Sequence, residues 1–164
     1  MFLILMGVSG CGKTTIGEGV SSELGIPFYD GDDFHPQENI EKMAAGIPLN
    51  DVDREAWLNK LRDLIEAGLK DGKSGIIACS ALKQKYRNKL LVDAKCVFFV
   101  YLKGSFDLIF NRMNARSDHY MKADMLKSQF EALEEPDDVF TVDISRSPNE
   151  IISRVCSFMK QKRT

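Results

Sequence analysis

One glycine-rich segment constrains this chain more than any other feature: residues 7–14 read GVSGCGKT and directly follow the apolar run Phe2–Met6. The spacing matches the pattern G-x-x-x-x-G-K-[ST] of a phosphate-binding loop between a strand and a helix. Backbone N–H groups of such a loop surround phosphates, and the helix N-terminus adds the positive end of its dipole. A plain glycine-rich turn would need neither the lysine nor the threonine. We therefore expect a nucleoside triphosphate to bind at Gly7, Val8, Ser9, Gly10, Cys11, Gly12, Lys13, Thr14 and Thr15.

Two side chains of this loop have distinct expected roles. Lys13 is placed to reach the β- and γ-phosphates, and the Thr14 hydroxyl is placed to bind Mg²⁺. Cys11 needs to supply only its backbone N–H, so we assign its thiol no chemistry.

The bulk composition indicates one soluble domain that spans residues 1–164, since a chain of this length can bury a core without disulfides. The net charge is −2, and the basic residues form no cluster beyond a short C-terminal run, which argues against a nucleic-acid partner. The four cysteines are scattered, as in reduced cytoplasmic proteins. No apolar run is long enough to span a membrane, and no signal peptide is expected.

Short apolar runs alternate with segments of helical periodicity, which predicts an α/β fold with a five-stranded parallel sheet and helices on both faces. The expected strands are Phe2–Met6, Ile26–Tyr29, Gly75–Cys79, Val97–Leu102 and Val139–Val142. The expected helices are Lys13–Leu24, Gln37–Ala45, Arg54–Lys70 with Asp53 as its N-cap, Lys83–Leu91, Phe106–Ala115, Ala123–Glu134 and Pro148–Lys162.

Two polar stretches interrupt this alternation, at about residues 30–54 and 115–124. Long polar segments at the ends of parallel strands are where α/β proteins bind substrates and carry mobile covers. We expect the first stretch to be a substrate-binding insert and the second to be a lid.

A pair of carboxylates, Asp30 and Asp32, ends the second expected strand. Alternate residues at a strand end can face the same site, and Gly31 between them allows the backbone to turn. One carboxylate can hold Mg²⁺ through water while the other accepts a proton from a substrate hydroxyl. The simpler alternative is that these aspartates cap a turn.

Two further sets of polar residues, each with two cations, are candidates for binding the anionic groups of the ligands. Arg112 and Arg116 lie four residues apart on one helical face before the expected lid, where one can stack on a base and the other can clamp a phosphoryl group. Ser80, Lys83 and Arg87 follow the middle strand, where a cation can pair with an anionic ligand. Both sets could instead be ordinary surface cations.

Several kinase and GTPase classes lack support in this sequence. The segment at Asn88 has leucine where a guanine-binding N-K-x-D signature requires aspartate, and no H-R-D or D-F-G set of a protein kinase is present. The remaining interpretation is a phosphotransferase that acts on a small molecule.

The chain resembles the gluconate kinase (gluconokinase) family over nearly its whole length. Beyond the phosphate loop, the resemblance rests on segments that read DGDDFHP, NIEKM, PLND, CSALK, YLKG, HYM and QFEALEEP, which begin at Asp30, Asn39, Pro48, Cys79, Tyr101, His119 and Gln129. The resemblance implies phosphorylation of D-gluconate at its 6-hydroxyl by ATP with Mg²⁺, in a cytoplasmic homodimer. It also implies the three-layer P-loop kinase fold, with strand order 2-3-1-4-5 and a mobile lid.

The resemblance further implies roles for single residues. Asp32 would be the base at the attacking hydroxyl, and Asp30 would lie nearer the metal. Arg112 would stack on adenine opposite the loop at Pro148, and Arg116 would cover the phosphates. Residues expected at the acceptor are Asp32, His35, Arg54, Ser80, Lys83 and Arg87. Which of the cations Arg54, Lys83 and Arg87 takes the gluconate carboxylate stays open.

Two alternatives remain at this point. The first is a related kinase for shikimate or another sugar acid, because only the resemblance identifies the acceptor. The second is a regulatory module that binds ATP without transferring phosphate. That module would have no use for two aspartates at the end of a strand beside the phosphate loop.

Overall fold

Parallel strand pairing organises the molecule. The computed structural model describes residues 1–115 and 122–163, and its five strands form one sheet in the order β2-β3-β1-β4-β5. Every pair in this sheet is parallel. The strands are β1 (Phe2–Met6), β2 (Phe28–Asp30), β3 (Gly75–Ala78), β4 (Val97–Lys103) and β5 (Phe140–Asp143). The predicted sheet order is confirmed, and the strand ends differ from the predicted ones by at most two residues.

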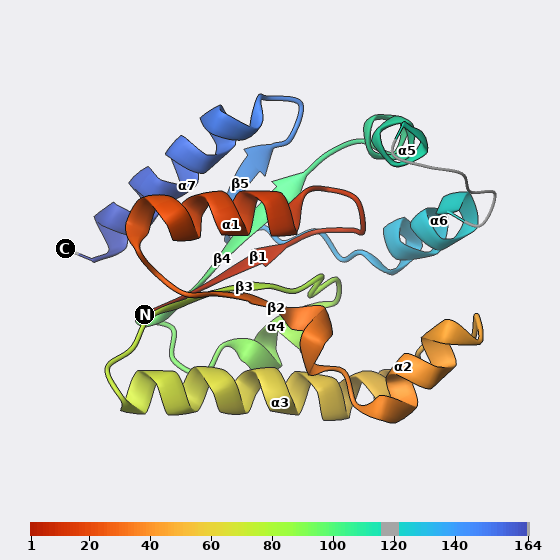
Figure 1. The fold of residues 1–164 in the computed structure, drawn as a ribbon, viewed down its shortest axis with the longest axis horizontal. Coiled ribbons are helices and arrows are strands. Elements are labelled where there is room, and N and C mark those ends of the chain that lie inside the picture. The colour runs from red at the N-terminus through yellow and green to blue at the C-terminus, as the bar shows by residue number, and fades with distance from the viewer. Residues whose placement is uncertain (116–121, 164) are drawn as a thin grey trace.

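Helices cover both faces of the sheet. Figure 1 shows α1 and α7 on one face, α3 and α4 on the other, and α2, α5 and α6 at the end where the strands terminate. A short 3-10 turn, η1 (Gly31–Phe34), follows β2. The α-helices are α1 (Lys13–Leu24), α2 (Gln37–Ala44), α3 (Asp51–Lys70), α4 (Gln84–Leu90), α5 (Phe106–Asn114), α6 (Lys122–Ala132) and α7 (Pro148–Lys162). None of the described helices is long and apolar enough to cross a membrane.

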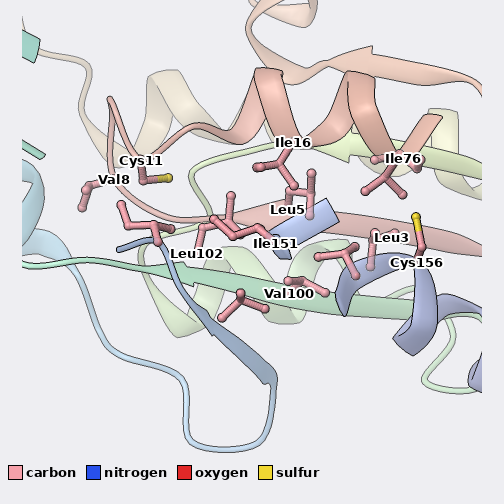
Figure 2. Packing of buried hydrophobic residues seen from close by; sticks show 14 of the residues in the cluster. Leu3, Leu5, Val8, Cys11, Ile16, Ile76, Val100, Leu102, Ile151 and Cys156 are labelled. Atoms are coloured by element: carbon pink, nitrogen blue, oxygen red, sulfur yellow. The ribbon is translucent and has the colours of Figure 1, made fainter. Parts of the chain in front are cut away.

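The central strand β1 divides the core into two layers. Leu3 and Leu5 point toward α1 and α7, where they meet Ile16 and Ile151 (Figure 2). Alternate residues of β1 point to the opposite face and pack against α3 and α4. All five β1 side chains are almost completely buried. A strand buried on both faces reads as a continuous apolar run, which is why β1 could be predicted from sequence.

The start of α3 differs from the prediction. Asn50, not Asp53, is the N-cap: its side chain accepts a hydrogen bond from the Asp53 N–H, and the Asp53 carboxylate accepts one from the Asn50 N–H. This reciprocal capping box satisfies two backbone donors that the first helical turn leaves unpaired. The helix therefore begins at Asp51, three residues earlier than expected, and brings Asp51 and Arg54 into its first turn.

Gly31 is required for a reason other than the expected turn. A Cβ atom at this position would lie 2.3 Å from the carbonyl oxygen of Ala78 on β3. No neighbouring flexible side chain could move aside, since the contact is with backbone. Gly31 thus allows the chain leaving β2 to pass directly over the end of β3.

Shortening a buried side chain of the central strand β1 should destabilise the whole domain. Leu5 is fully buried between β1 and the α1/α7 layer. We expect Leu5→Ala to lower the free energy of unfolding by about 2–5 kcal/mol, because it removes buried methyl groups and leaves a cavity. Urea denaturation followed by circular dichroism measures this change. Val52→Ala, at a side chain that is 76% exposed, is the control and should change stability by less than about 0.5 kcal/mol.

Candidate active site

The phosphate loop forms between β1 and α1 as the sequence predicts. Gly7, Gly10 and Gly12 have φ angles of 145°, 79° and 100°, a region of backbone conformation that favours glycine. The Lys13 ammonium donates hydrogen bonds to the carbonyl oxygens of Gly7 and Val8, both at 2.9 Å. These contacts hold the ammonium over the loop whose N–H groups would cradle a phosphate chain.

The loop and the acidic strand end meet directly. The Thr14 hydroxyl lies 3.3 Å from Oδ2 of Asp30, which is the last residue of β2. A hydroxyl and a carboxylate are the hard oxygen ligands that Mg²⁺ prefers, and Mg²⁺ usually takes only one or two protein ligands beside phosphate and water. Among the described residues there is no larger group of His, Cys, Asp or Glu able to hold a metal. Thr14 and Asp30 therefore fit a magnesium ion shared with phosphate.

Asp30 has a second contact that the sequence left as an alternative. Its Oδ1 accepts a hydrogen bond from the Asp32 N–H at 3.0 Å and so caps η1. Asp30 thus caps a turn with one oxygen and faces Thr14 with the other. Asp32 is left projecting from the first turn of η1.

The Asp32 carboxyl has a raised pKa. Partial loss of solvent on its protein-facing side is the larger cause, and repulsion from Asp30 is the second, while His35 and Lys13 oppose the rise. The Asp32 side chain is 85% exposed, so solvent screens these charges and weakens their effect on the pKa. A carboxylate with a raised pKa beside a phosphate site is suited to accept a proton from an alcohol.

His35 lies beneath Asp32 in a fixed orientation. Its ring stacks on Trp57 with 4.3 Å between ring centroids and 17° between planes. Nδ1 is 3.2 Å from the Asn39 amide nitrogen, which can only donate, so Nδ1 is the acceptor and the neutral ring carries its proton on Nε2. Nε2 lies 3.8 Å from Oδ1 of Asp32. His35 therefore presents an N–H toward the candidate base.

Burial lowers the pKa of His35, and the nearby cations Arg54 and Lys60 lower it further, while Asp32 opposes the shift. The His35 side chain is 6% exposed. His35 is accordingly neutral at neutral pH, so its Nε2–H faces Asp32 without adding charge to the site.

A second polar cluster gathers around Asp51 at the start of α3. Its carboxylate accepts hydrogen bonds from Lys83 at 3.2 Å, from Lys85 at 2.5 Å and from the Tyr86 hydroxyl. These three donors hold the pKa of Asp51 well below its usual range. Arg54 lies close enough to both Tyr86 and His35 for its positive charge to lower the pKa of each.

Arg87 occupies a different position from the other predicted cations. It is 4% exposed, and its guanidinium donates to the carbonyl oxygens of Ala81 and Leu82 and twice to Gln84. These four hydrogen bonds use most of the five donors that an arginine has. Arg87 therefore supports the loop between β3 and α4, and Arg54 and Lys83 are the more available cations for a ligand.

Arg112 lies against the loop that precedes α7. Its Nη2 donates to the carbonyl oxygen of Ile144 at 2.7 Å. Pro148 occupies the first turn of α7, as the sequence predicts, and Ser147 is the N-cap of this helix. The structure thus brings together the two features expected to enclose adenine. Arg116 and most of the expected lid lie outside the described residues.

Sequence reasoning gave no role to Asn39 and Trp57, although both hold His35. Trp57 donates its indole N–H to the Gly31 carbonyl at 2.6 Å, and Asn39 also donates to the Asp53 carbonyl at 2.9 Å. The only sequence signal for the Asn39 contact was that Asn39 follows His35 by four residues. This signal is weak, because Asn39 is also held by the start of α3, whose position was predicted incorrectly.

The sheet order, the phosphate loop and the acidic end of β2 define a P-loop kinase, an enzyme that transfers phosphoryl groups. A family model described as shikimate kinase matches residues 9–160. The thermoresistant gluconokinase of Escherichia coli K12 is 44% identical over 162 residues, which are 96% of this chain and 93% of that protein. The thermosensitive gluconokinase of the same strain is 47% identical over 87% of this chain and 78% of its own. The chain belongs to the gluconokinase family.

Solved structures agree with this assignment. A gluconokinase from Sinorhizobium meliloti 1021 is 35% identical, with a TM-score of 0.84 over 99% of this chain and 97% of that one. Shikimate kinase from Aquifex aeolicus is 18% identical, with a TM-score of 0.64 over 99% and 98% of the two chains. At that identity the second likeness concerns the fold alone.

The environment of His35 predicts its titration. We expect the pKa of the His35 ring to lie below the ordinary value of 6.5. An NMR titration of the two histidines measures it, and the His119→Gln variant assigns the two signals. Because the folded pKa is depressed, its contribution to stability is present above pH 6.5 and is lost as the pH falls through the folded pKa. Asp32→Asn should lower this pKa further, since it removes the carboxylate charge that favours protonation of His35. A His35 pKa at or above 6.5 would contradict the described geometry.

Proposed function

We propose that this chain transfers the γ-phosphoryl group of ATP to the 6-hydroxyl of D-gluconate, which yields ADP and 6-phospho-D-gluconate. The observation that supports the proposal is the 3.3 Å contact between Thr14 and Asp30, since Asp32 would then lie next to the end of a bound triphosphate. The family supports gluconate as acceptor, since its named members at 44% and 47% identity are gluconokinases.

On the donor side, the phosphate loop and Lys13 would neutralise the β- and γ-phosphates. The Lys13 ammonium now rests on two loop carbonyls and would turn to the phosphate oxygens. Thr14 and Asp30 would hold Mg²⁺, which when bound offsets the charge that develops on the phosphates. Arg112 and the loop at Pro148 would enclose adenine, and Arg116 would cover the phosphates.

On the acceptor side, Asp32 would take the proton of the 6-hydroxyl as its oxygen attacks phosphorus. The raised pKa of Asp32 brings its basicity closer to the working pH, which favours general base catalysis. The Nε2–H of His35 would orient the carboxylate, and the Asn39 and Trp57 contacts would hold His35 in that orientation. Phosphoryl transfer depends mainly on such positioning and on electrostatic stabilisation.

The gluconate carboxylate would meet Arg54 and Lys83, with Ser80 close to the hydroxyl chain. Arg54 lies near both Tyr86 and His35, so an acid bound there could extend its far end toward Asp32. Lys83 is paired with Asp51, which also holds Lys85 and Tyr86 in place. Asp51 thereby limits the free positive charge of this cluster.

Two further parts of the proposal rest on the resemblance to gluconokinases: a homodimer and a cytoplasmic location. The molar mass of the purified chain, measured by light scattering at assay concentrations, tests the first. A monomer there would remove the dimer from the proposal without affecting the chemistry.

A substrate panel tests the acceptor. With Mg·ATP, we expect gluconate to give a kcat/KM for ADP release at least about 100-fold above that of shikimate or a neutral polyol, because the wrong acceptor leaves buried polar groups unpaired. Lys13→Ala is the control and should abolish most turnover with every acceptor. ATP binding without ADP release would favour the regulatory alternative, and a preference for shikimate would favour the related kinase.

Loss of the candidate base should separate catalysis from binding. We expect Asp32→Asn to lower kcat by ~10²–10⁴ while ATP binding stays nearly intact. The same change should leave thermal stability at neutral pH equal or higher, because a raised pKa means that the ionised Asp32 is disfavoured in the folded protein. Asp33→Asn, at the exposed neighbour, is the matched control. Near-normal turnover of Asp32→Asn would assign the base elsewhere.

A further inference from the structure

Residues 129–135, here called the bridge segment, have no part in the chemistry proposed above. The segment includes the last turn of α6 and the chain that leaves it. It lies far from the phosphate loop in sequence, yet its side chains contact loops on both sides of the candidate site.

The first contact is with the donor side. Gln129 accepts a hydrogen bond from the Ser9 N–H at 2.6 Å. Among the described residues, this is the one side chain that accepts a hydrogen bond from a backbone N–H of the phosphate loop. Met113 of α5 lies against the neighbouring Gly10, where an added Cβ would meet its side chain at 2.7 Å. The outer turn of the loop is therefore held by α5 and α6 together.

The second contact is with the acceptor side. The Glu134 carboxylate accepts from the Gln84 N–H at 2.6 Å, and the Glu134 N–H donates to the Leu82 carbonyl at 2.9 Å. These bonds hold the loop between β3 and α4, which carries Ser80 and Lys83. Glu134 therefore fixes the backbone on both sides of Lys83.

The bridge segment is anchored between these two contacts. Leu126 in the preceding turn of α6 is fully buried, and Phe130 packs edge-on against Phe106 with ring centroids 5.7 Å apart. Glu135 forms an ion pair with Lys103 at 2.6 Å. A displacement at Gln129 would thus be transmitted to Glu134, because the segment between them is packed and short.

We propose that Gln129 and Glu134 are positioning residues that couple nucleotide binding to the acceptor loop. Phosphates that order the phosphate loop would fix Ser9 and Gln129, and through the bridge segment they would fix the backbone that carries Ser80 and Lys83. The acceptor then binds more tightly when the nucleotide is present, and the converse holds to the same factor. This inference rests on the proposed function for the identity of the acceptor, but not for the coupling itself.

Calorimetry of gluconate binding, with and without a non-hydrolysable ATP analogue and Mg²⁺, measures the coupling. We expect the analogue to tighten gluconate binding to the wild-type protein by about 5-fold or more. Gln129→Met and Glu134→Leu should each bring this factor close to one, and the double variant should show no further loss. Gln129 is half-buried and Glu134 is exposed, so neither substitution empties the core.

Two matched variants separate coupling from general damage. Glu134→Gln keeps an oxygen that can accept from the Gln84 N–H and should retain most of the coupling. Glu131→Leu alters an exposed residue in the last turn of α6 and should leave the coupling unchanged. A structural role alone would lower the melting temperature of the Gln129 and Glu134 variants but leave the ratio of the two gluconate affinities intact.

Amide hydrogen exchange gives a readout that does not need gluconate. The analogue should slow exchange at Gln84 in the wild-type protein and in Glu131→Leu, but not in Gln129→Met. If the wild-type protein fails to bind gluconate while this pattern holds, the proposed acceptor is wrong and the coupling stands. Equal slowing at Gln84 in wild type and Gln129→Met, or an unchanged affinity ratio in both bridge variants, would overturn the coupling.

Discussion

The parallel pairing of β3 with both β1 and β2 is the constraint on which the site depends. In this register Leu5, Ala78 and Asp30 lie side by side, so the three strands end at the same level. The chain then turns into the phosphate loop after β1 and into η1 after β2. Gly31 permits this arrangement by passing over the end of β3 without a Cβ. A donor loop and an acidic turn from distant parts of the sequence thus become neighbours.

The site places like charges close together and offsets them locally. Asp30 and Asp32 repel each other, which contributes to the raised pKa of Asp32, and Lys13 and the Nε2–H of His35 partly compensate. A neutral, buried His35 is compatible with this balance because a second cation would pull the pKa of Asp32 down and weaken it as a base. The supports of His35 come from α2 and α3, since Asn39 contacts its Nδ1 and Trp57 stacks on its ring.

Much of the fold was predictable because its signals are local. Buried parallel strands read as apolar runs, and Gly25 in the left-handed conformation and Pro148 mark helix ends. The predicted N-cap of α3 was wrong because Asn50 and Asp53 both suit that position, and only the reciprocal hydrogen bonds between them decide which residue caps the helix. The contact of Ser9 with Gln129 spans 120 residues, so no local pattern could indicate it. The burial of Arg87 was equally hidden, since its sequence context is that of a surface cation.

In the proposed reaction, Asp32 lies between a triphosphate held by Thr14 and Asp30 and an acid held by Arg54 and Lys83. A crystal structure with gluconate and a non-hydrolysable ATP analogue tests it most directly. We expect the 6-hydroxyl within hydrogen-bonding distance of Asp32 and in line with the γ-phosphate, with the gluconate carboxylate at Arg54 or Lys83. A gluconate bound in the opposite direction, with its carboxylate at Asp32, or a 6-hydroxyl held by another residue would contradict it.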